Sequence, residues 1–295
     1  MKRTHVFVAI ACLLVATPAV GSVYVGAHPD DIELFMGRNA ADDVSSGARV
    51  VFILLTAGDA GYGTGVGANA YGIPYYRARL DAHEKAVRFW ASLKGLRPPQ
   101  STKSVGPILG HQVERVDIGP MVTLYNLNLP DGGGINPDAQ SLRKLMSGEI
   151  ATITSVDGGA SYTQVELGAV IRNIIAVTHA GVFATWVNFQ DEDATINPGD
   201  HEDHLAAGAL VAYALAGDSG FSCVNKARFT GYSTQDLPLN LSPADQVGHS
   251  ATWGVINGAL VDEGNPTTWD STHLAWLGKQ YYRQEIGTGT CSYNH

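Results

Sequence analysis

The chain has 295 residues, of which 45% are hydrophobic and 16% charged, and its formal net charge is -9. Because Lys and Arg form no cluster beyond the first three residues, the chain lacks the basic patch that a nucleic acid or an anionic membrane surface would bind. The composition is that of a soluble globular protein, long enough for one large domain or two small ones.

The N-terminus has the pattern of an export signal. A basic start precedes the apolar segment 6–16, "VFVAIACLLVA", and small residues follow up to Gly21. The alternative is an uncleaved membrane anchor, but the apolar segment is shorter than the ~20 residues that span a bilayer. We therefore expect residues 1–21 to be removed. The mature protein would be a single domain, 22–295, that is secreted or periplasmic.

Removal of the signal would leave only two cysteines, Cys223 and Cys291. In an exported protein such a pair predicts a disulfide, and two buried free thiols are the alternative. Neither cysteine belongs to a CxxC motif, so the sequence does not predict zinc ligation by cysteine.

Strand and helix patterns alternate along the mature chain. Continuous apolar runs predict strands, at 22–27, 49–58, 113–129 (a strand or hairpin), 182–188 and 227–232. Helical periodicity predicts helices, at 33–46, 75–93, 139–147, 164–176, 201–215 and 273–285. Alternating units of this kind predict an α/β fold: a Rossmann-like, open, mostly parallel sheet flanked by helices in three layers.

Polar side chains follow the first predicted strand. The segment "VYVGAHPDDIEL" passes from an apolar run directly into His28, Asp30 and Asp31. Two adjacent carboxylates at a buried strand end require a cation nearby. Together with His204, at the start of a later helix, His28 and Asp31 would form a set of two imidazoles and one carboxylate, which binds zinc. The alternative is a surface turn whose aspartates cap the next helix.

Three spaced motifs carry a resemblance to a known family. They are "AHPDDIE" (27–33), "TAG" (56–58) and "HEDH" (201–204), the last followed by Gly208. In this order and spacing they resemble the LmbE/PIG-L family of zinc-dependent N-acetylglucosaminyl deacetylases. The resemblance extends to about residue 217, and it departs from the family pattern at Glu202, where the family usually has proline.

The resemblance implies a metal site and a catalytic pair. Zn²⁺, or another divalent cation, would be bound by His28, Asp31 and His204. Asp30 would act as general base on a water whose pKa the metal lowers. His201 would stabilise the oxyanion, as a protonated imidazole, or protonate the leaving amine.

Two further roles are assigned less directly. Asp203 could hydrogen-bond an imidazole and fix its tautomer. Arg79 matches the arginine of the family's Arg-x-x-Glu pattern and would contact substrate, although Ala82 replaces the glutamate. Arg77 or Glu84 would take over this role if the register were shifted.

The resemblance therefore implies an exported N-deacetylase that hydrolyses the acetamide of an N-acetylglucosamine-type sugar or glycoconjugate to an amine and acetate. Its partner would be a small-molecule or oligosaccharide amide, with no nucleic acid and no membrane segment after signal cleavage. Two alternatives remain: a zinc amidase for a different acyl group, and a non-catalytic sugar-binding protein on the same fold. A pure binder would not need the general base Asp30.

Overall fold

A computed structural model describes residues 20–93, 99–133, 140–179, 184–289 and 291. Its main element is an eight-stranded sheet. In spatial order the strands are β10 (Tyr282–Glu285), β9 (Asn225–Phe229), β8 (Ala184–Gln190), β1 (Val20–Gly26), β2 (Arg49–Thr56), β5 (Val122–Leu129), β4 (His111–Ile118) and β3 (Ser101–Ile108). The five strands from β9 to β5 are parallel, and each of the outer strands β10, β4 and β3 pairs antiparallel with its inner neighbour.

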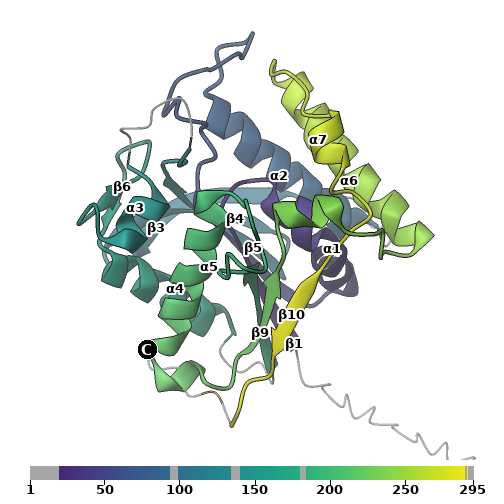
Figure 1. Ribbon diagram of the computed structural model, residues 1–295. Coiled ribbons are helices and arrows are strands. Elements are labelled where there is room, and N and C mark those ends of the chain that lie inside the picture. Colours follow the sequence, from purple (N-terminus) through teal and green to yellow (C-terminus); the bar gives the residue numbers. More distant parts are fainter. Residues whose placement is uncertain (1–19, 94–98, 134–139, 180–183, 290, 292–295) are drawn as a thin grey trace, which may run out of the picture.

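Helices cover both faces of this sheet (Figure 1). One face carries α3 (Leu142–Ser147), α4 (Gln164–His179) and α5 (Glu202–Ala216). The other carries α1 (Gly37–Ser46), α2 (Tyr75–Ser92) and α6 (Pro243–Asp262). The shorter elements are η1 (Ile32–Met36), β6 (Ile153–Thr154), β7 (Ser161–Tyr162), η2 (Ser219–Phe221), η3 (Tyr232–Asp236) and α7 (Ser271–Leu274).

Two hydrophobic cores result, one on each face of the sheet. Along β2, Ile53 belongs to the core under α4 and α5, and its neighbours Phe52 and Leu54 belong to the core under α1, α2 and α6. Strands buried on both faces read as continuous apolar runs, which is why the parallel strands could be predicted. The predicted three-layer α/β fold is confirmed.

The predictions fail in three places. The helix expected at 273–285 is wrong: only α7 is helical there, and 282–285 form strand β10. Gly278, with φ of +78°, lies between the two, in a conformation that ends a helix. Strand β3 and the long helix α6 were not predicted at all.

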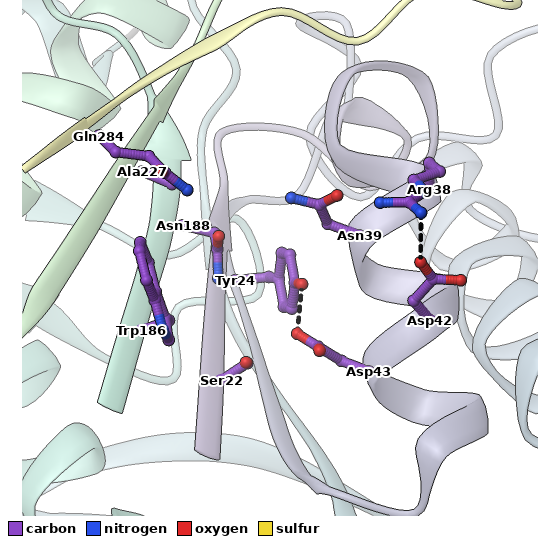
Figure 2. Close-up of a pocket in the computed structure, with 10 residues that line it drawn as sticks. All are labelled: Ser22, Tyr24, Arg38, Asn39, Asp42, Asp43, Trp186, Asn188, Ala227 and Gln284. Carbon is purple, nitrogen blue, oxygen red and sulfur yellow. Dashed lines mark hydrogen bonds and ion pairs between the residues drawn. The ribbon is translucent and has the colours of Figure 1, made fainter. Parts of the chain in front are cut away.

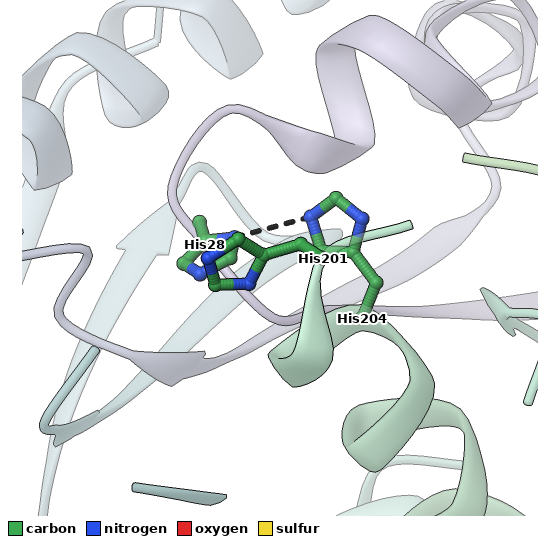
Figure 3. Close-up of side chains that lie close together, drawn as sticks. All are labelled: His28, His201 and His204. Carbon is green, nitrogen blue, oxygen red and sulfur yellow. Dashed lines mark hydrogen bonds between the residues drawn. The ribbon is translucent and has the colours of Figure 1, made fainter. Parts of the chain in front are cut away.

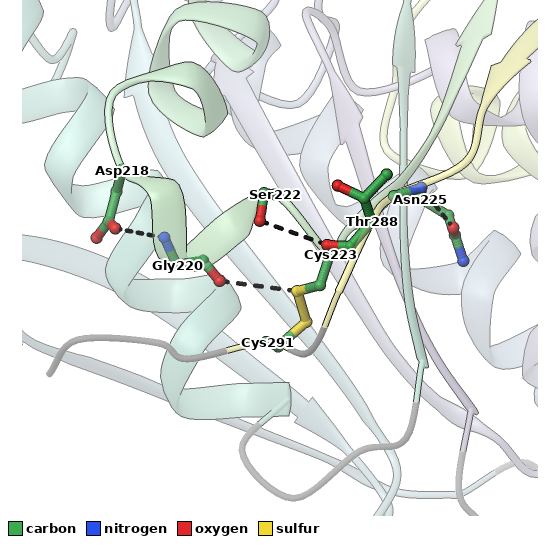
Figure 4. The surroundings of a disulfide bond; sticks show 8 residues. Asp218, Gly220, Ser222, Cys223, Asn225, Thr288 and Cys291 are labelled. Carbon is green, nitrogen blue, oxygen red and sulfur yellow. Dashed lines mark hydrogen bonds between the residues drawn. A yellow bond between two sulfur atoms is a disulfide. The ribbon is translucent and has the colours of Figure 1, made fainter.

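A disulfide joins Cys223 and Cys291, with 5.1 Å between their Cα atoms (Figure 4). It links the chain just before β9 to the chain beyond β10. Next to it, the backbone N–H of Thr288 donates to the carbonyl of Ser222 at 2.9 Å. Of the two alternatives for these cysteines, the structure has the disulfide.

Strand β1 begins at Val20, and Gly21 already pairs with Arg49 of β2. Two residues of the expected signal segment therefore belong to the strand, and the rest of that segment lies outside the described residues. Within the described ranges, no helix combines the length and apolar character needed to cross a bilayer.

Candidate metal and catalytic site

The predicted site residues come together at the carboxyl edge of the parallel strands. His28 follows β1, and His204 lies in the first turn of α5, the helix after β8. The connection after β1 is held by Thr56, whose hydroxyl donates to the carbonyl of Ala27 at 2.7 Å. Gly208 lets α5 approach this edge, because a Cβ there would lie 2.3 Å from the carbonyl oxygen of Gln190. Thr56 of the "TAG" motif and Gly208 after the "HEDH" motif thus each have a structural role at the site.

His28, Asp31 and His204 face one another. His28 Nδ1 lies 3.2 Å from His204 Nε2 and 3.3 Å from the Asp31 carboxylate, and His204 Nε2 lies 2.9 Å from that carboxylate. All three residues are buried. Figure 3 shows that His201 comes from the same end of α5, with its ring next to that of His28.

Two carboxylates that the sequence analysis did not single out hold these imidazoles. Asp200 Oδ1 lies 2.8 Å from His204 Nδ1, and Asp131 Oδ1 lies 3.1 Å from His28 Nε2. In the neutral rings, the nitrogen next to each carboxylate carries the proton. The lone pairs of His28 Nδ1 and His204 Nε2 then point at each other and at Asp31, an arrangement that only a cation stabilises.

The donor set fits zinc. Ligands about 2.0–2.1 Å from a tetrahedral Zn²⁺ lie about 3.3 Å from one another. This is close to the separations among His28, Asp31 and His204, called the trio below. Two wider groupings also bring ligand atoms within 4.8 Å of one another: His28–His201–His204 and His28–Asp131–His201–Asp203. We favour His28, Asp31 and His204, because their ligand atoms lie 2.9–3.3 Å from one another, whereas Asp203 Oδ2 is 3.8 Å from His28 Nε2.

Without a metal, the trio holds protons. Burial would lower the pKa of His204, but Asp31 and Asp200 raise it to about 9. Burial would also lower the pKa of His28, which Asp31 and Asp131 raise well above its ordinary value. Burial would raise the pKa of Asp31, but His204 and His28 hold it well below its usual range. A bound dication would replace the imidazole protons, so metal binding should release protons.

We expect the metal-free protein to lose stability as pH rises from about 6.5 to about 9. The folded pKa of His204, about 9, exceeds the unfolded value of ~6.5. Its stabilising effect is therefore complete below the unfolded value and lost as pH rises through the folded one. Melting temperatures measured in chelator should fall over this window, and His204→Gln should flatten the fall. An equally steep fall in His204→Gln would contradict the assignment.

Asp30 lies at the pocket, in an ion pair with Arg79. Arg79 also donates to the carbonyl of Gly58 at 2.8 Å. Burial would lower the pKa of Arg79, but Asp30 holds it above its ordinary value, so the guanidinium is cationic. Position 58 requires glycine, because its φ is +58° and a Cβ there would lie 2.4 Å from Arg79 Nη1. Arg79 therefore fixes the carboxylate of Asp30, and its contact with substrate stays a prediction.

Arg77 and Glu84, the register alternatives for Arg79, have partners away from the pocket. Arg77 forms an ion pair with Glu114 of β4. Glu84 accepts a hydrogen bond from Ser101 and pairs with Lys103, both on β3. These residues of α2 thus contact the antiparallel edge of the sheet rather than the pocket.

His201 is the N-cap of α5, and its Nδ1 accepts a hydrogen bond from the Asp203 N–H at 3.2 Å. Burial, with the neighbouring His28 and His204, lowers the pKa of His201. Because its Nδ1 accepts from the Asp203 N–H, Nε2 is the ring nitrogen that carries a proton, and the catalytic role expected for His201 stays a prediction. Asp203 Oδ2 is 3.8 Å from His28 Nε2, beyond hydrogen-bonding distance. The carboxylates that hydrogen-bond His28 Nε2 and His204 Nδ1 are Asp131 and Asp200.

The site opens into a pocket of about 240 Å³. Its lining includes Asp30, Arg79, Asp131, His201 and Tyr232. A hollow of similar volume, about 260 Å³, lies elsewhere, between α1 and the sheet (Figure 2). There the Tyr24 hydroxyl donates to Asp43 at 2.6 Å, and the described residues that line the walls include no histidine. Volume alone does not identify the functional site, whereas the histidine and carboxylate cluster does.

The fold and the cluster define the class: a three-layer α/β protein with a histidine–carboxylate site at the carboxyl edge of its parallel strands. The profile of one family, described as PIG-L: GlcNAc-PI de-N-acetylase, matches residues 23–215. The chain belongs to this PIG-L family, whose activity is the hydrolysis of an amide. No curated protein matches the chain in sequence.

Solved structures with low sequence identity are similar to the chain. N,N′-diacetylchitobiose deacetylase from Pyrococcus horikoshii is 13% identical, with a TM-score of 0.44, covering 87% of this chain and 70% of that one. The zinc-inhibited form of a teicoplanin deacetylase is 14% identical, with a TM-score of 0.43 and coverage of 81% and 84%. 4-Carboxy-2-hydroxymuconate hydratase from Pseudomonas putida is 11% identical, with a TM-score of 0.45 and coverage of 87% and 82%.

Proposed function

We propose that the chain is an exported, metal-dependent N-deacetylase that hydrolyses the acetamide of an N-acetylglucosamine-type sugar or glycoconjugate. The observation that carries this proposal is the convergence of the ligand atoms of His28, Asp31 and His204 beside the carboxylate of Asp30. A divalent cation held by the trio would polarise the acyl carbonyl and lower the pKa of a water molecule in the pocket.

The chain's own residues would then carry the reaction. Asp30, fixed by Arg79, takes a proton from the water as the water's oxygen bonds to the carbonyl carbon. The Nε2–H of His201 donates to the oxygen on which negative charge develops. As the C–N bond breaks, the proton passes from Asp30 to the leaving nitrogen. The products are acetate and the sugar amine.

Export is part of the proposal. It is supported by the basic and apolar pattern of the first residues and by the disulfide between Cys223 and Cys291. Disulfides persist in oxidising compartments, such as the periplasm or the extracellular space.

A colorimetric assay for released amine tests the proposal. Purified protein is incubated with chitooligosaccharides, with and without a chelator, and zinc is then added back. We expect amine release that the chelator abolishes and zinc restores. Binding without amine release would instead favour the non-catalytic sugar-binding protein. Turnover confined to amides with other acyl groups would favour the amidase alternative.

A further inference from the structure

A second, larger hollow adjoins the catalytic pocket. Its volume is about 570 Å³, within the ~300–1,000 Å³ typical of sites that bind a whole small ligand, whereas the catalytic pocket is smaller. Three side chains line both hollows: Tyr232, His273 and Trp276. All three lie outside the segment 23–215 that the family profile matches. The second hollow is therefore built jointly by the loop 195–199, inside the matched segment, and by residues of 232–276, beyond it.

The shared wall is rigid. The rings of Tyr232 and Trp276 stack with centroids 4.6 Å apart and planes 15° apart. The indole N–H of Trp276 donates to the backbone carbonyl of Tyr232 at 3.1 Å. The ring of His273 stacks on Trp253, and its Nδ1 lies 2.9 Å from Asp270 Oδ1. Side chains held in this way lose little conformational entropy when a ligand binds.

The remaining lining combines apolar and hydroxyl-binding groups without a cation. Leu237 and Ile196 expose 37% and 39% of their surface and both line the hollow. Ser233 and Gln235 add a hydroxyl and an amide. Among the described residues that line it, the charged one is Asp236, and none is Lys or Arg. The ammonium of Lys279, next to the lining, is held by the backbone carbonyl of Gln235 at 2.6 Å, so the described lining side chains offer a phosphate or carboxylate group no lysine or arginine. A neutral sugar ring matches both the apolar and the polar groups.

We propose that this hollow is a subsite for a second, uncharged sugar ring attached to the N-acetylated one. The acetamido sugar occupies the catalytic pocket, and its neighbour crosses the Tyr232–Trp276 wall. The preferred substrate is thus a neutral oligosaccharide rather than a monosaccharide or a phosphate-linked sugar. This inference rests on the proposed deacetylase function.

The test compares kcat/KM for N-acetylglucosamine, N,N′-diacetylchitobiose and N-acetylglucosamine 1-phosphate. We expect the disaccharide to exceed both monosaccharides by at least tenfold. Leu237→Trp should fill the hollow and bring the ratio of disaccharide to monosaccharide close to unity, and Ile196→Trp should do the same from another part of the wall. The control Leu239→Trp, at an exposed residue that lines neither hollow, should leave the ratio unchanged.

Each outcome decides between the two claims. Equal kcat/KM for mono- and disaccharide, a preference for the phosphate, or an unchanged ratio in both filling variants would overturn the subsite. A wild-type protein that deacetylates none of the sugars would overturn the proposed function instead. In that case calorimetric binding of the disaccharide, compared between wild type and Leu237→Trp, still tests the subsite. Equal binding by the two proteins would refute it.

Discussion

Asp30→Asn should lower kcat for amide hydrolysis by about 10²–10⁴-fold, the usual contribution of a general base, while leaving bound metal in place. The asparagine amide has nearly the same shape but cannot accept the proton that the attacking water must lose. Metal content should persist, because His28, Asp31 and His204 supply the ligands. Steady-state kinetics and elemental analysis on the same preparation measure both effects.

A matched control separates this effect from a general loss of charge. Asp42 is a carboxylate on α1, ion-paired with Arg38 and remote from the catalytic pocket. Asp42→Asn should therefore keep wild-type turnover. Near-normal turnover in Asp30→Asn would remove Asp30 from the role of base.

The second large effect is expected for His204→Ala, which should lose the metal. The substitution removes one of three donors and leaves Asp200 without the ring that it orients. Elemental analysis should find about one zinc per chain in the wild type, as in a site with three protein ligands, and almost none in the variant. Turnover should fall with the metal content.

His273→Ala is the matched control for this variant. His273 also lines the catalytic pocket, but its Nδ1 contacts Asp270 rather than the trio. The control should retain wild-type zinc. Unchanged zinc stoichiometry in His204→Ala would refute its assignment as a ligand.

His28, Asp31 and His204 could be predicted because each lies next to a strongly apolar strand or helix. His28 and Asp31 follow a continuous apolar strand, and His204 begins an apolar helix. Asp131 and Asp200 were missed, although each contacts a ring of the trio. Asp200 directly precedes His201, so its position was a usable signal. Asp131 offered none, because only the parallel pairing of β2 with β5 brings its loop to the site.

The C-terminal part was harder to predict, for a physical reason. The buried face of α6 includes the polar residues His249, Thr252 and Asn257, which hide its helical periodicity. Its start was nevertheless readable, because Ser242 caps the helix and proline follows at the first position. Strand β10 owes its conformation to pairing with β9, a contact that local sequence does not encode.

Anomalous diffraction at the zinc absorption edge, on crystals of the zinc-loaded chain, tests the central claim most directly. We expect a single strong peak about 2.0–2.2 Å from His28 Nδ1, from a carboxylate oxygen of Asp31 and from His204 Nε2. A peak between Asp131 and Asp203 instead, or no peak within bonding distance of His204, would contradict the account.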